Sequence, residues 1–173
     1  MSLTPNQVLG HAVGQAPIGE VANYPQRVEV IHRARAWVTD LNTANKAAGE
    51  NMMLYIDSTY MPNGIKVVGV NWYPGLAVTA HATNNATVVV ASRTAAGVAG
   101  STISTQTTTS GGSGSLVAHV VYAAGVTTAA NAYVAAGYSI TCKVTKANSG
   151  VKIAAAAASA GDLFGIEVLY QIL

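Results

Sequence analysis

The sequence predicts an all-β domain, either a sandwich or a barrel, and three observations carry that prediction. From Ile65 onward, short segments of alternating apolar and polar residues follow one another at roughly 8–12-residue spacing. Small turn residues separate these segments, as at Pro74-Gly75 and Ser149-Gly150. From Thr94 to Cys142 the chain contains no Lys, Arg, Asp or Glu. A surface built from Thr, Ser, Gly, Asn and Ala is typical of a domain that neighbouring copies or a large assembly cover.

The composition limits the class of protein further. A length of 173 residues predicts one domain with an arm. Charged residues make up 9% of the chain and hydrophobic residues 50%, against about 25% charged residues in an ordinary globular protein. This apolar content argues against a disordered chain, and a net charge of +2 without a basic tract argues against nucleic-acid binding. Cys142 is the only cysteine, so no intrachain disulfide can form.

The sequence shows no signal for secretion or membrane insertion. The first residues, MSLTPNQVLGHAVGQAP, lack a basic segment followed by an apolar run. A run of about 18 apolar residues, which a transmembrane helix needs, is also missing from the sequence. We therefore expect a protein made in the cytoplasm that does not enter a membrane.

Residues 1–26 differ in composition from the rest and predict an extended N-terminal arm, with the folded domain in residues 27–173. Three prolines and several glycines disfavour both helix and continuous sheet in this segment. Apolar residues are nevertheless scattered through it, which suits an arm that docks onto another surface. A terminus without a partner is the alternative. The candidate contact residues of the arm are Leu3, Val8, Leu9, Ile18 and Val21.

Residues 27–38 form the first candidate element, and either a strand or a helix is open. As a strand, the segment has a charged face that contains Arg33 and Arg35 and an apolar face that contains Ala34 and Ala36. His32, Ile31 and Trp37 depart from this alternation. A helix stays open because Ala and Arg are good helix formers.

The next candidate strand is Asn51–Ile56, and the turn residues Met61–Gly64 follow it. The later candidates have clearer alternation, best seen where Ile140, Cys142 and Val144 share one face. These strands are Ile65–Trp72, Leu76–Ala80, Ala86–Ser92, Ile103–Thr109, Leu116–Tyr122, Tyr138–Thr145, Val151–Ala155 and Leu163–Leu173.

The residues that usually carry catalysis form no recognisable constellation. The four histidines, His11, His32, His81 and His119, stand far apart and none has a metal-ligand spacing with another His, Cys or carboxylate. The three Asp and four Glu show no paired motif, and Cys142 lies on the apolar face of its strand. We therefore expect no enzyme activity, no metal and no cofactor.

Aromatic residues offer the clearest candidate for a ligand surface. Tyr60, Trp72 and Tyr73 could together provide stacking faces. The alternative, which we favour, is that Trp72 anchors the core while Tyr73 covers its edge.

Two tracts carry a resemblance to a known class of proteins. The first runs from Trp72 to Gly97 and the second from Asn131 to Val151. Both consist of Ala-, Thr- and Val-rich strands with small-residue turns, such as Thr83-Asn84-Asn85-Ala86-Thr87 and Val134-Ala135-Ala136-Gly137. In this character the chain resembles the head decoration, or cement, proteins of tailed bacteriophages. The resemblance covers roughly residues 72–155 and matches no family-defining residue one to one.

The resemblance implies a jelly-roll-like antiparallel β-sandwich, often a homotrimer, on the outer capsid surface of the virion. Its partner would be the major capsid protein, and its role the stabilisation of the assembled shell without catalysis. The arm residues Leu3, Val8, Leu9, Ile18 and Val21 would then contact the shell. The alternatives are a receptor- or glycan-binding tail or fibre module that uses Tyr60, Trp72 and Tyr73, a shell subunit, and an enzyme.

Overall fold

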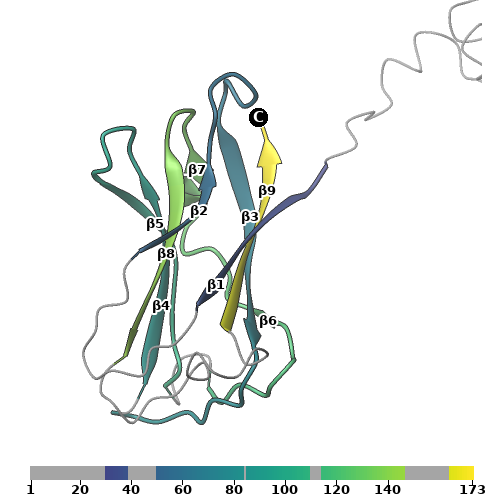
Figure 1. Ribbon diagram of the computed structural model, residues 1–173, viewed down its shortest axis with the longest axis vertical. Helices are drawn as coiled ribbons and strands as arrows, with labels where there is room; N and C mark the ends of the chain where they lie inside the picture. The colour runs from purple at the N-terminus through teal and green to yellow at the C-terminus, as the bar shows by residue number, and fades with distance from the viewer. Residues whose placement is uncertain (1–29, 39–49, 84, 110–113, 147–163) are drawn as a thin grey trace, which may run out of the picture.

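A computed structural model describes residues 30–38, 50–83, 85–109, 114–146 and 164–173 (Figure 1). Antiparallel strands and one turn of 3₁₀ helix make up the regular structure of these residues. The strands form two sheets that face each other, with sheet A on the right of Figure 1 and sheet B on the left. The prediction of an all-β sandwich is confirmed.

Sheet A is built around the last described strand of the chain. Its order is β1-β9-β3-β6, and the short strand β7 also pairs with β3. The bounds are β1 His32–Val38, β9 Phe164–Ile172, β3 Ile65–Pro74, β6 Tyr122–Ala123 and β7 Tyr133–Val134.

Sheet B has the order β2-β8-β4-β5. Its bounds are β2 Asn51–Tyr55, β8 Ser139–Lys146, β4 Ala86–Arg93 and β5 Ala99–Thr107. A 3₁₀ turn, Ala130–Ala132, precedes β7.

The order of the strands is that of a jelly roll. β6 and β7 both lie antiparallel against β3, so together they form one interrupted strand. With that strand counted once, the first and last strands of the chain are neighbours in sheet A, and the second and the next-to-last are neighbours in sheet B. This nesting of antiparallel strands in two packed sheets defines the jelly-roll architecture.

The core lies between the sheets and follows the alternation read from the sequence. In β4, Ala86, Val88 and Val90 are buried while the residues between them are partly exposed. From sheet A, Trp72 and Phe164 enter the core with their rings edge to face and their centroids 5.6 Å apart. Both side chains are buried, which makes them an anchor of the sandwich.

A segment of residues 124–132 closes one side of the sandwich. The Ala124 backbone N–H donates to the Val70 carbonyl of β3 at 2.7 Å. Three residues later, the Thr127 N–H donates to the Ile103 carbonyl of β5 at 2.8 Å. Asn131 then donates from its side-chain amide to the Thr102 carbonyl at 2.8 Å. The segment therefore ties sheet A to sheet B and covers backbone groups along β5.

The structure decides one open question and corrects two predicted strands. Residues 32–38 form a strand rather than a helix, because pairing with β9 satisfies their backbone groups. Leu76–Ala80 and Leu116–Tyr122 were wrong as continuous strands, since Val78 and Leu116 form a single bridge and Tyr122 belongs to the short strand β6. His119 interrupts the extended backbone with φ of 62°.

The remaining expected elements fall into two groups. The turn after β2 is confirmed at Gly64, whose φ of 79° favours glycine. The expected strand Val151–Ala155 and the N-terminal arm lie outside the described residues. Within those residues, no helix has the length and apolar character needed to cross a membrane.

Candidate functional site

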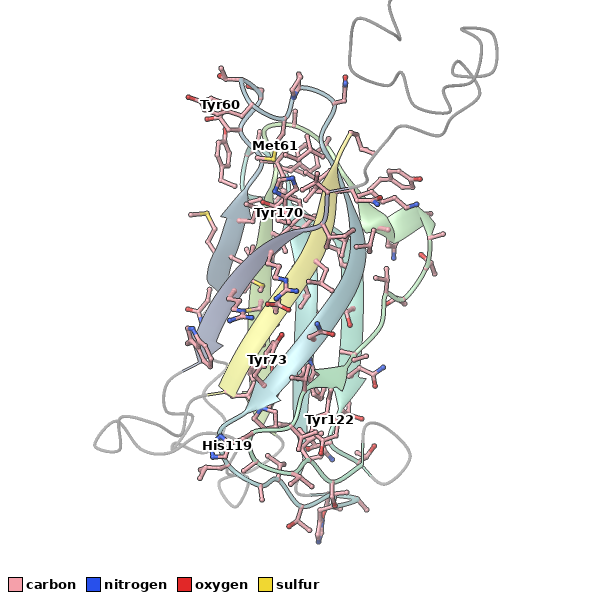
Figure 2. The ribbon with its side chains drawn as sticks, turned by 90° about the vertical axis from the view of Figure 1, so that its right-hand side faces the viewer. Tyr60, Met61, Tyr73, His119, Tyr122 and Tyr170 are labelled. Atoms are coloured by element: carbon pink, nitrogen blue, oxygen red, sulfur yellow. The ribbon has the colours of Figure 1, made fainter. Side chains whose placement is uncertain are left out.

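A buried carboxylate stands out on the outer face of sheet A, the side that faces the viewer in Figure 2. Alternation along β9 directs Phe164, Ile166 and Val168 into the core and Glu167 outward. Glu167 nevertheless has only 1% of its surface exposed. The register places it between Arg35 of β1 and Asn71 of β3. Neighbouring side chains, rather than the core, therefore cover this charge.

Three donors satisfy the Glu167 carboxylate. The Arg35 Nε–H donates to Oε2 at 2.5 Å, while the Tyr73 hydroxyl and the Asn71 amide donate to Oε1 at 2.6 and 3.2 Å. Burial by itself raises the pKa of Glu167. The hydrogen bonds from Tyr73, Arg35 and Asn71 outweigh burial and bring the pKa below its ordinary value. The carboxylate is thus ionised, with both oxygens engaged.

The same network fixes Arg35 and Tyr73 against each other. The guanidinium carbon of Arg35 lies 5.0 Å from the centroid of the Tyr73 ring, a cation–π contact. The bond to Glu167 raises the pKa of the Tyr73 hydroxyl, with a further rise from burial, so this hydroxyl stays protonated as a donor. Arg35 keeps 45% of its side chain exposed. The buried Glu167 carboxylate therefore fixes the Arg35 guanidinium in place, although part of that guanidinium remains accessible to solvent.

Trp37 covers the next position along the sheet. It pairs with Gly165, which in turn pairs with Tyr73. A Cβ at Gly165 would lie 2.7 Å from the Trp37 ring carbon Cζ3, so the indole lies directly on the glycine backbone. The Trp37 side chain remains 51% exposed. Glycine at 165 therefore provides the space in which the indole lies against the sheet.

Arg33, Arg35 and Trp37 share the outer face of β1, since side chains two apart in a strand point the same way. Arg33 is exposed, and no described residue forms an ion pair or hydrogen bond with it. We call the group of Arg33, Arg35, Trp37, Tyr73 and Glu167 the outer-face platform. It has the character of a binding surface, with one exposed aromatic face and two accessible guanidinium groups.

The residues of the predicted aromatic surface do not come together. Trp72 is 1% exposed and lies in the core, as the favoured interpretation had it, so the alternative in which it stacks on a ligand is wrong. Side chains alternate between the two faces of β3, so the Trp72 side chain points into the core and the adjacent Tyr73 side chain points outward. Tyr60 is 78% exposed in the turn after β2, and Figure 2 shows it at the opposite end of the sandwich from Tyr73.

Sequence reasoning missed most of the platform. The signal was present in the spacing of Arg33, Arg35 and Trp37, which places all three on one strand face. Trp37 was treated as a break in the pattern because a large apolar residue was expected inward. His32, another of the three exceptions, lies on the inner side, where its ring stacks on that of Tyr170 with the centroids 5.3 Å apart.

A second surface is apolar and lies in the loop after Leu116. Val117, Val120 and Val121 are 59%, 44% and 53% exposed. The loop is held in place by two bonds, from the Val117 N–H to the Tyr122 hydroxyl at 2.6 Å and from the His119 N–H to the Pro74 carbonyl at 2.7 Å. We call Val117, Val120 and Val121 the valine loop. A fixed loop that exposes three valines is a candidate contact surface.

The described residues contain no group of three or more His, Cys, Asp or Glu that could hold a metal ion. The predicted arm contacts, Leu3, Val8, Leu9, Ile18 and Val21, lie outside the described residues. Comparison of the chain with family models, with curated proteins and with solved structures gave no match. Its function is therefore inferred from the fold and from these two surfaces.

Proposed function

We propose that the protein is a non-enzymatic structural protein of a virion, one that binds the outside of an assembled bacteriophage capsid and stabilises it. The observation that carries the proposal is the jelly roll itself, an architecture common among viral capsid domains. Because one fold serves many functions, the surfaces have to support the proposal as well.

The uncharged stretch of the chain supports the proposal. Residues 94–142 contain no Lys, Arg, Asp or Glu and supply β5, the connecting segment 124–132 and the valine loop. Contacts made by such surfaces need no desolvation of charge. They suit docking against a capsid protein or against other copies of the chain, which is consistent with a homotrimer on the shell.

The proposed mechanism is linkage. A protein that binds the assembled shell and not the free subunits stabilises the shell in proportion to its concentration and affinity. The partner is the major capsid protein. The arm of residues 1–26, with Leu3, Val8, Leu9, Ile18 and Val21, and the valine loop are the proposed contacts.

Co-sedimentation with purified shells tests the proposal. Full-length protein should saturate the shells and raise their disassembly temperature, and deletion of residues 1–20 should abolish binding. Circular dichroism should show that the sandwich persists in the truncated protein. Full occupancy of the shell by the truncated protein would contradict the role of the arm, and failure of the full-length protein to bind shells would contradict the function.

A pair of matched variants tests the valine loop. Val120→Ser with Val121→Ser should reduce shell occupancy, because it places hydroxyl groups in an apolar contact. Val98→Ser is the control, since Val98 is 62% exposed in the turn between β4 and β5. Equal occupancy by the loop variant and the control would show that the valine loop is not a contact. Light scattering on the free protein should give about three times 17.6 kDa if the trimer precedes docking.

A further inference from the structure

We propose that the outer-face platform is a binding site for an acidic oligosaccharide, with one sugar ring on Trp37 and the carboxylates of the next two rings on Arg35 and Arg33. This inference does not depend on the capsid proposal, because it rests on β1, β3 and β9 and not on the uncharged residues 94–142. It also replaces the predicted aromatic surface of Tyr60, Trp72 and Tyr73 with a different set of residues.

The aromatic part of the site is preformed. Contact with Gly165 keeps the Trp37 indole against the sheet, and half of the side chain remains open to solvent. A fixed and exposed aromatic face suits the C–H face of a sugar ring, because stacking then costs little side-chain entropy.

The cationic part is also preformed. Glu167 holds Arg35 through Nε alone, and the Tyr73 ring holds the guanidinium from one side. No carboxylate among the described residues pairs with the two terminal nitrogens of Arg35, since its ion pair with Glu167 runs through Nε. These nitrogens can therefore donate side by side to an incoming carboxylate.

The spacing of the groups suits a short oligosaccharide. Arg33, Arg35 and Trp37 alternate along one strand, so successive side chains on this face lie about 7 Å apart. That distance is comparable to the length of one sugar residue in a chain. A carboxylate on the ring next to the stacked ring would therefore reach Arg35, and one on the following ring would reach Arg33.

Charge favours an acidic sugar over a neutral one and over a nucleic acid. Arg33 has no carboxylate partner among the described residues, whereas Arg93 of sheet B is paired with Glu50. A neutral sugar would leave both guanidinium groups of the platform unused. A nucleic acid would need a longer basic track than two arginines, and the net charge of the chain is only +2.

The proposed site also explains why a carboxylate is buried at Glu167. A carboxylate at 1% exposure is costly to bury, and an apolar residue would serve the sheet equally well. Glu167 instead orients Arg35 and Tyr73 while it remains out of reach of the ligand. We assign it as a positioning residue.

The test measures binding of tri-galacturonate, with galactotriose as the neutral control and a dT oligonucleotide as the nucleic-acid control. Calorimetry gives the affinity. Tryptophan fluorescence reports the site, because Trp72 is buried and Trp37 is half exposed. We expect tri-galacturonate to bind, to shift the fluorescence and to bind more weakly as salt rises. No binding at millimolar concentrations, equal binding of galactotriose, or tighter binding of the oligonucleotide would overturn the proposal.

Variants locate the site. Trp37→Ala should weaken binding about tenfold or more, as loss of a central aromatic contact does. Tyr55→Ala is the matched control, because Tyr55 is 52% exposed on β2 and should bind as the wild type does. Arg33→Gln should weaken binding of tri-galacturonate and flatten its salt dependence without affecting the fold, since no described residue bonds to Arg33. Wild-type affinity in both Trp37→Ala and Arg33→Gln would overturn the proposal.

Discussion

The substitution Glu167→Gln should destabilise the protein at neutral pH and have almost no effect in acid. Glutamine keeps the size of the side chain and one acceptor oxygen, so the packing on the outer face of sheet A is preserved. What changes is the charge, and with it the bonds from Tyr73 and Asn71 to Oε1 and from Arg35 to Oε2. If the glutamine oxygen takes the place of Oε1 and keeps its two donors, the glutamine NH₂ takes the place of Oε2. This NH₂ then faces the Arg35 Nε–H, and two hydrogen-bond donors cannot bond to each other.

The magnitude follows from these bonds. A hydrogen bond to a charged group contributes about 1.5–3 kcal/mol and a neutral one about 0.5–1.5 kcal/mol. Two bonds at Oε1 therefore weaken by about 1 kcal/mol each. The exposed guanidinium of Arg35 turns to water at little cost. The expected loss in the free energy of unfolding is about 2 kcal/mol, which corresponds to roughly 4–8 °C in melting temperature for a domain of this size.

The pH dependence has a definite sign. The pKa of Glu167 is lower in the folded protein than in the unfolded chain, so the stabilisation is full above the unfolded pKa. It disappears as the pH falls through the folded pKa, because the wild-type side chain then becomes protonated like the amide. The difference between wild type and variant should therefore begin to shrink below the ordinary pKa of a glutamate, about 4.3, and disappear once the pH lies below the folded pKa.

Urea unfolding followed by circular dichroism at neutral and acid pH measures both quantities. Glu50→Gln is the control, because Glu50 pairs with Arg93 but keeps 30% of its side chain exposed. Its effect should stay below about 1 kcal/mol. The same loss for Glu167→Gln at both pH values, or wild-type stability at neutral pH, would refute the assignment of Glu167 as an ionised and bonded carboxylate.

Two further predictions concern the backbone and the thiol. Gly64→Ala should cost more than about 2 kcal/mol and Gly97→Ala about 1 kcal/mol, because both have positive φ but only a Cβ at Gly64 meets the Val134 carbonyl. Equal urea midpoints for the two variants would contradict this. Burial raises the pKa of Cys142 to about 11, so a thiol reagent at neutral pH should modify it only as fast as the protein unfolds. Immediate reaction with the folded protein would show that the thiol is accessible.

The sequence predicted the sandwich well where one face of a strand is apolar. The alternation in β4, β8 and β9 led directly to their inward residues, because burial of one face imposes a period of two. It failed at Leu76–Ala80 and Leu116–Tyr122, whose composition is strand-like. Apart from the Val78–Leu116 bridge and the pairing of Tyr122 with β3, these segments form no strand ladder. Strand propensity cannot predict whether a segment pairs with a neighbouring strand, because that pairing depends on residues distant in sequence.

The candidate site was less predictable than the fold. Tyr73 was recognised, but its partners Arg35 and Glu167 are separated by more than a hundred residues and meet only through the register of β1 and β9. The position of Trp37 depends on a glycine across the strand pair, at Gly165. A pattern within one short segment of the sequence cannot predict either the Arg35–Glu167 contact or the Trp37–Gly165 contact. The alternation of Arg33, Arg35 and Trp37 was the one visible signal of a functional strand face.

The nesting of β9 between β1 and β3 has a consequence for how the protein reaches its native state. Sheet A cannot be completed until residues 164–172 are available, because β1 pairs with β9 and β9 joins it to β3. Pairing of β1 with β9 also closes a loop of more than a hundred residues, which slows folding. During synthesis, β1 and the β9-facing edge of β3 therefore stay unpaired, while β4 can already pair with β5 and β3 with β6 and β7. The nascent chain is most exposed to aggregation in that interval.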